Sequence, residues 1–249
     1  MNDSPTPSSS EHSDIFVTTR WTVVLTAADH SAAEAERAME EICQIYWFPL
    51  YAYIRRRGHS PEDAEDLTQE FFRQLLEHRW IENADREKGK LRAFLITALK
   101  RFISNEWRKA CAQKRGGGQR VLSLDSSIAE GRYSSTTTPG MDAERLYDRE
   151  WALTLLDLTI KQLGNEYADA GKTNLFARLK DGLVMSHEAL DYPSLSTDLD
   201  MTEGAIRVAV HRMRKRFREI YRNEVSQTLP PGADLDEELH HLSSCLTHE

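Results

Sequence analysis

The chain has 249 residues, of which 40% are hydrophobic and 29% charged, and its formal net charge is −8. This length allows one large globular domain or two small ones, and the absence of a long apolar run excludes a transmembrane helix and a signal-peptide core. The three cysteines, Cys43, Cys111 and Cys245, are odd in number and widely spaced, so we expect a reducing, cytoplasmic setting without a disulfide framework.

The net charge hides a segregation of charge along the chain. Glu62–Glu70 contains five acids and no base, and the segment after Pro230 contains five acids and no lysine or arginine. Arg86–Arg115, by contrast, contains ten bases and two acids. Separate acidic and basic surfaces predict a protein that contacts both another protein and DNA.

The first predicted helix spans Ala32–Arg57 and carries an apolar face at helical spacing, with a kink expected at Pro49. Its end, Arg55–Gly58, places cations in the last turn and a glycine just beyond it, as helix C-termini favour. Before this helix, the Ser/Pro-rich residues 1–14 are predicted to be disordered, and Thr18–Leu25 forms a short apolar segment.

A second helix is predicted to begin at Ser60-Pro61-Glu62-Asp63. The serine caps the helix, the proline suits its first position, and the acids complement the positive end of the helix dipole. Its predicted buried face consists of Ala64, Leu67, Phe71, Phe72, Leu75 and Leu76. The dipole explains the first acids but explains Asp66 and Glu70 poorly, because its effect fades beyond the first turn.

A polar loop, Trp80–Lys90, is predicted to lead into a third helix, Leu91–Cys111. The residues expected to face inward are Leu91, Phe94, Leu95, Ala98, Phe102 and Ile103. Bases interleaved with aromatic residues along this helix suit single-stranded DNA, because phosphates pair with cations while unstacked bases find aromatic faces. Packing in the core explains Phe94 and Phe102. For Trp107, periodicity alone does not decide between a place in the core and stacking on a DNA base.

Residues 114–140 contain GGG, SS and SSTTTPG, which predicts a flexible linker and a domain boundary. The glycine run is not a phosphate loop, because the spacing and the Lys-Ser/Thr pair of that motif are absent. Two further helices are predicted at Met141–Leu163 and Asn174–Leu183. No stretch alternates as a strand does, so the fold class is all-α, with two small helical domains joined by the linker.

Met201–Arg222 is predicted to be a basic amphipathic helix. Thr202 reads as its N-cap, and one apolar stripe recurs at steps of three and four residues: Ile206, Val210, Met213, Phe217 and Ile220. From Arg207 to Arg222 there are seven bases and one acid, Glu219. A short apolar pattern at Tyr192, Leu195 and Leu199 precedes it across a tight break, which is typical of a DNA-binding helix-turn-helix. The alternative is a solvated surface helix.

The tail after Pro230-Pro231-Gly232 is predicted to contain a short acidic helix, Asp234–Leu246, whose four leucines at helical spacing need cover. We hypothesise that this helix folds against the helix-turn-helix domain or a partner. The tail also carries His241, Cys245 and His248, with His240 beside them, at a spacing that suits a metal. A fourth ligand is not evident from the sequence, so surface histidines and no metal or cofactor are the expectation.

Two blocks of the sequence closely resemble bacterial sigma factors of the sigma-70 family. Tyr51–Glu77, with SPEDAEDLTQEFF at Ser60–Phe72, resembles conserved region 2, and Phe94–Arg108 resembles its promoter-melting part. Thr202–Arg216, which begins with TEGAIRVAVHR, resembles the region 4 recognition helix. The resemblance covers most of residues 15–225, and the two-domain pattern without a long acidic N-terminal domain resembles the extracytoplasmic-function (ECF) subfamily.

The resemblance implies a dissociable specificity subunit of RNA polymerase, with no catalysis of its own. The implied division is a disordered N-terminus (1–14), region 2 (15–113), a linker (114–140), region 4 (141–226) and an acidic tail (227–249). Within the linker, the acidic stretch Leu122–Tyr133 is implied to thread near the polymerase active cleft and the RNA exit. The residues implied to dock on core polymerase are Asp63, Asp66, Gln69 and Glu70. Those implied at the −10 element and the melted strand are Trp80, Arg92, Lys100, Arg101, Asn105, Trp107 and Arg108. Those implied at the −35 element are Thr202, Glu203, Arg207, Val208, His211 and Arg212.

Some residues depart from the family pattern. Phe94, Arg101 and Asn105 stand where the family usually has Trp, Asn and Asp, so base preference cannot be carried over. Asp200 stands where the family favours glycine, and Pro193 where a helical acid is usual, so the first helix of the helix-turn-helix is expected to start late.

Two other classes of function remain open. A stand-alone regulator would use the C-terminal domain to bind an operator without polymerase, with steep salt dependence. An interaction protein would use its acidic tail to mask the basic helix. An anti-sigma factor or other regulatory partner is compatible with the resemblance. An enzyme is not expected, because the nine histidines do not pair with a nucleophile or carboxylate motif.

Overall fold

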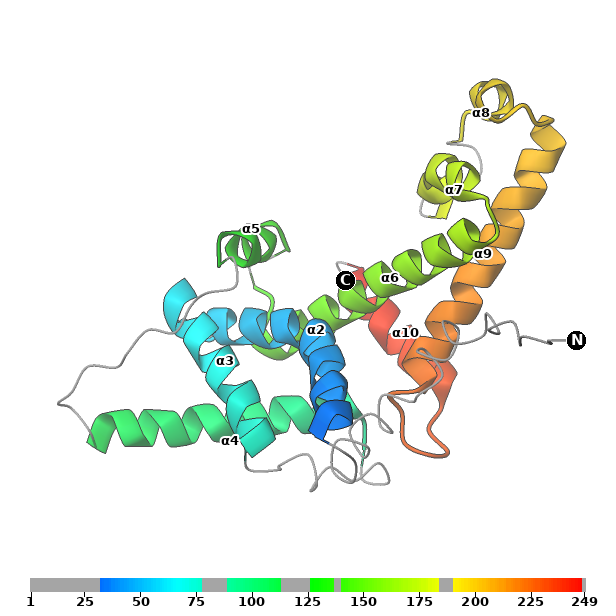
Figure 1. Ribbon diagram of the computed structural model, residues 1–249. Coiled ribbons are helices and arrows are strands. Elements are labelled where there is room, and N and C mark those ends of the chain that lie inside the picture. Colours follow the sequence, from blue (N-terminus) through cyan, green and yellow to red (C-terminus); the bar gives the residue numbers. More distant parts are fainter. Residues whose placement is uncertain (1–31, 78–88, 113–125, 137–139, 184–189, 248–249) are drawn as a thin grey trace, which may run out of the picture. The chain divides into compact units, whose positions relative to one another are not determined.

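The computed structural model describes residues 32–77, 89–112, 126–136, 140–183 and 190–247. Every regular element in these ranges is helical, which confirms the all-α prediction (Figure 1). None of the helices described there has both the length and the apolar character that crossing a membrane requires. Residues 1–14, Thr18–Leu25, Trp80 and His248, on which predictions were made, lie outside the described ranges.

The helices divide into two compact units. The first contains the described residues up to Tyr147 together with Gln227–Ala233, and the second contains Asp148–Ser226 and the described residues from Asp234 onward. Helix α6, Ala143–Asp169, therefore begins in the first unit and continues in the second.

The first unit is built from α2 (Ala32–Arg56), α3 (Pro61–Glu77), α4 (Leu91–Ala112), α5 (Ser126–Thr136) and the start of α6. Pro49 lies inside α2, and Figure 1 shows this helix changing direction part way along, as expected where a proline removes a backbone hydrogen bond. The largest fully buried side chains of this unit are Tyr46, Leu50, Tyr51, Tyr53, Ile54, Phe71, Leu75, Leu91, Phe102 and Tyr147. They form an apolar core that fixes the orientations of α3 and α4.

Helix α5 lies within the segment that composition predicts to be a flexible linker. Its residues form no apolar stripe, but Ala129 is only 7% exposed and Glu130 is fixed by a bidentate pair with Arg55, at 2.7 and 2.9 Å. The Tyr51 hydroxyl donates a third bond to Glu130 at 2.9 Å, and the Arg132 guanidinium lies 4.0 Å from the Phe48 ring centroid. Contacts to α2 therefore stabilise this helix, and the composition of the segment itself does not predict them.

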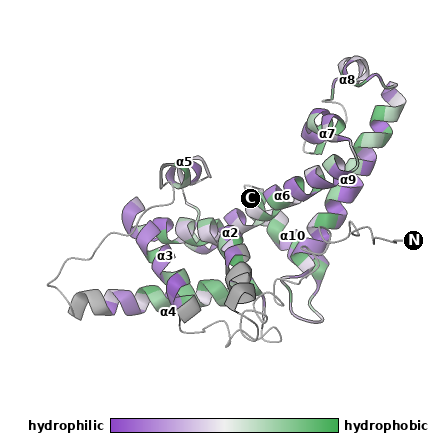
Figure 2. Cartoon of the chain, viewed as in Figure 1, coloured by the Kyte–Doolittle hydropathy of each residue, from purple (hydrophilic) through white to green (hydrophobic). Residues whose placement is uncertain are grey.

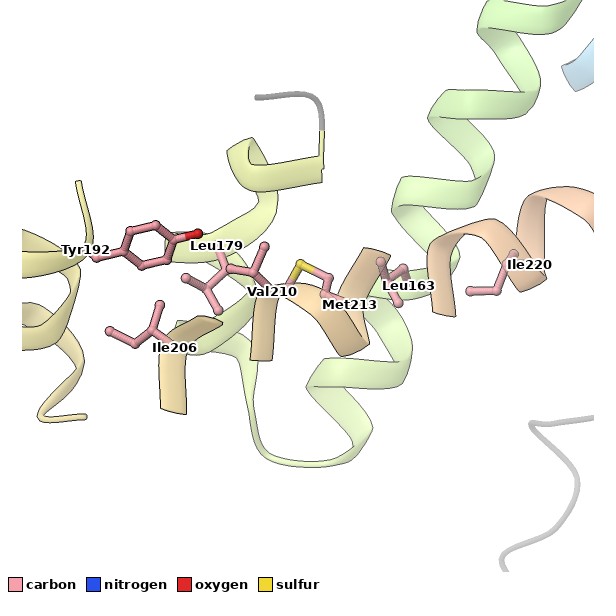
Figure 3. Close-up of a cluster of buried hydrophobic side chains, with 7 residues drawn as sticks. All are labelled: Leu163, Leu179, Tyr192, Ile206, Val210, Met213 and Ile220. Atoms are coloured by element: carbon pink, nitrogen blue, oxygen red, sulfur yellow. The ribbon is translucent and has the colours of Figure 1, made fainter. Parts of the chain in front are cut away.

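The second unit contains the rest of α6, α7 (Thr173–Leu179), the 3₁₀ turn η4 (Lys180–Leu183), α8 (Tyr192–Leu199), α9 (Glu203–Ser226) and α10 (Leu235–Leu246). Its core joins four of these elements through Leu163, Leu179, Tyr192, Ile206, Val210, Met213 and Ile220 (Figure 3). Four of the five residues in the predicted stripe of α9 are thus buried, and Phe217 packs against the same cluster. Figure 2 shows hydrophobic and hydrophilic residues alternating along α9, as an amphipathic helix requires.

The tail helix α10 packs on the C-terminal part of α9. Glu238, Leu242 and Cys245 are buried on it, and Arg222 of α9 pairs with Asp236 at 2.6 Å. Burial and the nearby Glu238 raise the pKa of Tyr221 to about 12. The sequence hypothesis offered two alternatives, a tail helix folded against its own C-terminal domain or against a partner, and the packing of α10 on α9 corresponds to the first.

Candidate nucleic-acid and protein interfaces

The N-terminal half of α3 carries a cluster of acids. Ser60 caps the helix as predicted, accepting a hydrogen bond from the Asp63 backbone N–H at 3.1 Å. Because Ala64, Thr68, Phe71 and Leu75 are fully buried, the opposite face of the helix meets solvent. Asp63 and Asp66, two of the residues predicted to dock on a partner, are exposed there.

The other two predicted docking residues are half-buried and engaged by neighbours on the same helix. The Gln69 amide donates to Glu65 at 3.1 Å, and Glu70 accepts from Arg73 at 2.7 Å and from Gln74 at 2.7 Å. Glu65 itself, which the sequence interpretation did not single out, is only 6% exposed. Burial, together with Asp66 and Glu62, raises the pKa of its carboxyl group. A partner that presents cations here would relieve this concentration of negative charge.

Helix α4 presents a basic and aromatic face to solvent. Arg101, Asn105 and Arg108 follow one another at steps of four and three residues, and all three are exposed. Trp107 is 68% exposed, the same as Ile128 and more than any other exposed large hydrophobic residue in the described chain. Exposure removes the core explanation for Trp107 and leaves an aromatic ring available among cations. The opposite face, Leu91, Leu95, Leu99 and Phe102, is buried in the first unit.

Lys100 lies beside this face and is engaged by its own unit. Its ammonium pairs with Glu144 at 2.7 Å and lies 5.9 Å from the Tyr53 ring centroid. The hydrogen bond to Glu144 raises the pKa of Lys100 and lowers that of Glu144. Nearly half of the Lys100 side chain is still exposed, so this cation is accessible to solvent despite its pair with Glu144.

Arg92 lies on the other side of α4. It precedes Leu95 and Leu99 by three and seven residues, which places it on the buried face, and it is only 7% exposed. Its guanidinium is therefore not part of the exposed stripe to which the sequence interpretation assigned it. The helical spacing of Arg92 to Leu95 and Leu99 would have predicted this burial from the sequence. Trp80, the remaining residue of the set, is outside the described ranges.

In the second unit the short helix α8, a tight turn and the basic helix α9 follow one another, which is the order of elements predicted for a helix-turn-helix. Asp191 caps α8 and accepts from the Ser194 backbone N–H at 3.1 Å, with Pro193 in the first turn. Asp200 ends α8 in the left-handed conformation with φ 50°, where an aspartate costs less than most other non-glycine residues. Thr202 caps α9, as predicted, and accepts from the Ala205 backbone N–H at 3.2 Å.

The start of α9 exposes all six residues predicted to read DNA: Thr202, Glu203, Arg207, Val208, His211 and Arg212. Val208 is 49% exposed despite being apolar, whereas Ile206 and Val210 on either side of it are buried. Arg207 is oriented by two neighbours, since its guanidinium lies 3.9 Å from the Tyr192 ring centroid and 3.6 Å from Glu203. The first two turns of α9 thus present a polar surface on a rigid apolar base.

The seven basic residues of α9 fall into two groups, those that bind other residues of their own unit and those that are exposed without an ion pair in the described part of the chain. Arg216 pairs with Glu166 at 2.7 Å and Arg214 donates to the Gly182 carbonyl at 2.6 Å, so both tie the helix to its own unit. The hydrogen bond to Glu166 raises the pKa of Arg216 further. Arg212, Lys215 and Arg218 are exposed and make no ion pair with any residue in the described part of the chain. These three cations and Arg207 are the ones positioned to meet a polyanion.

Comparison with known families gives a match in the first unit. Residues 49–112, which are 64 of the 249 residues, match the family model of sigma-70 region 2. The matched segment includes the acidic face of α3 and the basic face of α4. The match shows that this segment is similar to region 2 of the sigma-70 family of transcription initiation factors. No curated protein and no solved structure matches the chain.

Proposed function

We propose that this chain, whose residues 49–112 match sigma-70 region 2, is an ECF-type sigma factor that binds core RNA polymerase and directs promoter recognition, melting and transcription initiation. The observation that carries the proposal is the presence of two features in one chain. The segment that matches region 2 contains an acidic and a basic helix face. It is followed by a short helix, a tight turn and a basic helix, which we interpret as a helix-turn-helix. A stand-alone operator-binding protein needs only the second feature.

In the proposed mechanism, α3 docks on core polymerase. The exposed carboxylates of Asp63 and Asp66, with Gln69 and Glu70 beside them, meet a basic surface on the enzyme. Electrostatic complementarity of this kind raises the association rate and fixes the orientation of the complex. The protein acts by binding and positioning, and no catalytic group or cofactor is part of the proposal.

The exposed face of α4 then holds the separated promoter strand. Arg101 and Arg108 neutralise phosphates, and Trp107 offers its ring to an unstacked base. Lys100 exchanges Glu144 for a phosphate, and Asn105 offers its amide to a base edge. Because base stacking on an aromatic ring tolerates any sequence, this face melts DNA without fixing the base preference by itself.

The first turns of α9 read the −35 element in the major groove. Arg207 and Arg212 have the length and the paired donors that guanine recognition needs, and Val208 can contact a thymine methyl group. Thr202, Glu203 and His211 lie on the same exposed surface and complete the candidate reading set. The domain division of the proposal is region 2 at 15–113, a linker at 114–140 and region 4 at 141–226, with the tail at 227–249.

A sigma factor of this kind works where core polymerase is, so the proposed location is the bacterial cytoplasm. In the same proposal α5 leaves α2 when the linker enters the polymerase cleft, and the acidic face of α3 or the basic face of α9 is available to an anti-sigma partner.

The alternative function is a helix-turn-helix regulator that binds an operator without polymerase. The observation that favours this regulator is the exposed bases of α9, without any contribution from the region 2 match.

Run-off transcription distinguishes the two functions. The template is the DNA upstream of the gene for this chain, and purified bacterial core polymerase is used with and without the protein. Initiation that depends on the protein is the expected result, and its start site locates both promoter elements. Tight binding of the protein alone to that duplex, without transcription by the polymerase, would instead establish the regulator.

A further inference from the structure

Three side chains with metal-ligand chemistry converge in the second unit, and none of them belongs to the surfaces discussed above. Asp148 comes from the start of α6, and His241 and Cys245 come from α10, 93 and 97 residues later in the chain. His241 Nε2 lies 3.1 Å from Asp148 Oδ2 and 3.8 Å from Cys245 Sγ. One ligand atom of each residue lies within 4.8 Å of the other two.

These distances are close to those that zinc requires. Zinc binds histidine nitrogen and carboxylate oxygen at about 2.0 Å and thiolate sulfur at about 2.3 Å in a tetrahedron. That geometry separates nitrogen from oxygen by about 3.3 Å and either of them from sulfur by about 3.6 Å. The two separations that involve His241 thus already match to within a few tenths of an ångström, and a small rotation of a side chain closes the third.

The exposure of the three side chains suits a site with one open position. Cys245 is 5% exposed and forms the floor, whereas the side chain of Asp148 is 20% exposed and that of His241 is 45% exposed. A water molecule can therefore complete the tetrahedron from the His241 side. His241 and Cys245 are four residues apart on one face of α10, so helix geometry already holds two of the ligands together.

We propose that Asp148, His241 and Cys245 bind a zinc ion, with water as the fourth ligand, and that the metal fastens the tail helix α10 to α6. Binding displaces the thiol proton of Cys245 and leaves His241 neutral with Nε2 on the metal, so zinc uptake releases protons and strengthens with pH. The metal replaces the hydrogen bond between His241 and Asp148. This site is independent of the sigma-factor proposal, because it requires neither polymerase nor DNA.

The test uses the tag-free, full-length protein. Zinc is titrated against a chromophoric chelator, and cobalt(II) replaces it for spectroscopy, because thiolate-bound tetrahedral cobalt absorbs strongly in the near ultraviolet and visible. The expected result is one equivalent of zinc and a thiolate–cobalt band, with a higher melting temperature when zinc is present. Absence of a thiolate band from the wild-type protein would overturn the proposal without reference to any variant.

Four variants locate the ligands. Asp148→Asn, His241→Ala and Cys245→Ser should each weaken zinc binding at least tenfold, and Cys245→Ser should also abolish the thiolate band. His240→Ala is the matched control, because this exposed histidine precedes His241 on the same helix and is not part of the cluster. Equal zinc affinity in wild type and the three ligand variants, or equal loss in His240→Ala, contradicts the site. Circular dichroism checks that each variant is folded.

Discussion

Individual basic residues on α9 are expected to differ in function because their surroundings differ. Arg212 is exposed and unpaired within the described chain, whereas Arg216, one turn later, is held by Glu166 and Glu219. A count of charges in the sequence treats the two as equal. In the structure Arg212 faces solvent, whereas Arg216 stabilises its own unit.

Arg212→Ala should therefore weaken initiation at promoters that depend on the −35 element, by about 1–3 kcal/mol if the guanidinium reads a base in bidentate fashion. Arg207→Ala should act in the same direction, since Arg207 is the other exposed arginine on the reading face. Run-off transcription from templates with intact and scrambled −35 elements measures the effect. Arg216→Ala is the control and should lower the melting temperature while leaving promoter preference unchanged. Equal loss on both templates would contradict base reading by Arg212.

The pair between Arg55 and Glu130 makes a pH-dependent contribution to stability. The hydrogen bonds from Arg55 lower the pKa of Glu130 from its ordinary value of 4.5. A carboxyl group with a lowered folded-state pKa stabilises the protein above its unfolded-state pKa, and that contribution is lost as the pH falls through the folded-state value. Glu130→Gln should thus destabilise the protein by at most about 1 kcal/mol at pH 7, since the pair is partly exposed.

Urea unfolding of the wild type and Glu130→Gln, repeated from pH 7 down to below pH 4.5, measures this contribution. The difference between the two proteins should shrink over that range as Glu130 is protonated. Glu144→Gln provides a comparison, because Lys100 lowers the pKa of Glu144 in the same way at a more exposed position. A difference that stays constant with pH would show that the ion pair is not its source.

At the scale of elements, α3 combines a buried apolar face with an exposed acidic one. Asp66→Lys should abolish binding to core polymerase and leave the fold intact, because Asp66 is exposed and lies opposite the buried face. Pull-down with core enzyme measures binding, and circular dichroism measures helicity. Asp157→Lys makes the same charge change at an exposed position on α6 and should leave binding unaltered. Retention of wild-type binding by Asp66→Lys would remove α3 from the docking surface.

The tail helix α10 is expected to be a structural part of the second unit. Leu242 has no exposed surface and Cys245 is only 5% exposed, so the apolar face of α10 is already buried within the chain. Leu242→Ala should lower the free energy of unfolding by about 2–5 kcal/mol, the usual cost of a cavity left by leucine. Leu239→Ala, at a half-buried position on the same helix, should cost less. Denaturant unfolding gives both values, and equal small effects would mean that α10 is not packed.

At the scale of the whole molecule, acids and bases are concentrated on different helices, the acids on α3 and the bases on α4 and α9. With a net charge of −8, the chain repels DNA overall, whereas the exposed cations on α4 and α9 attract it. We expect the protein alone to bind its promoter duplex at least roughly tenfold more weakly than the complex with core polymerase does at the same salt concentration. Fluorescence anisotropy with labelled promoter DNA measures both affinities. Equally tight binding by the isolated protein would favour the operator-binding alternative.

The sequence by itself determined most of the helices, with α5 as an exception, and the apolar faces that the long ones bury. Steps of three and four residues identified Ile206, Val210 and Met213 as core, and capping residues such as Ser60 and Thr202 marked where helices begin. These predictions succeed because the helix period and the cap hydrogen bonds are local. The information that they need lies within a few neighbouring residues.

Only the tertiary structure decided which polar side chains are engaged and by what. Arg216 meets Glu166 across 50 residues, Glu130 meets Arg55 across 75, and His241 meets Asp148 across 93. Such partners are brought together by the packing of whole helices, so no local pattern contains them. The same packing formed α5 in a segment whose composition predicts a coil, because contacts with α2 outweigh weak helix propensity.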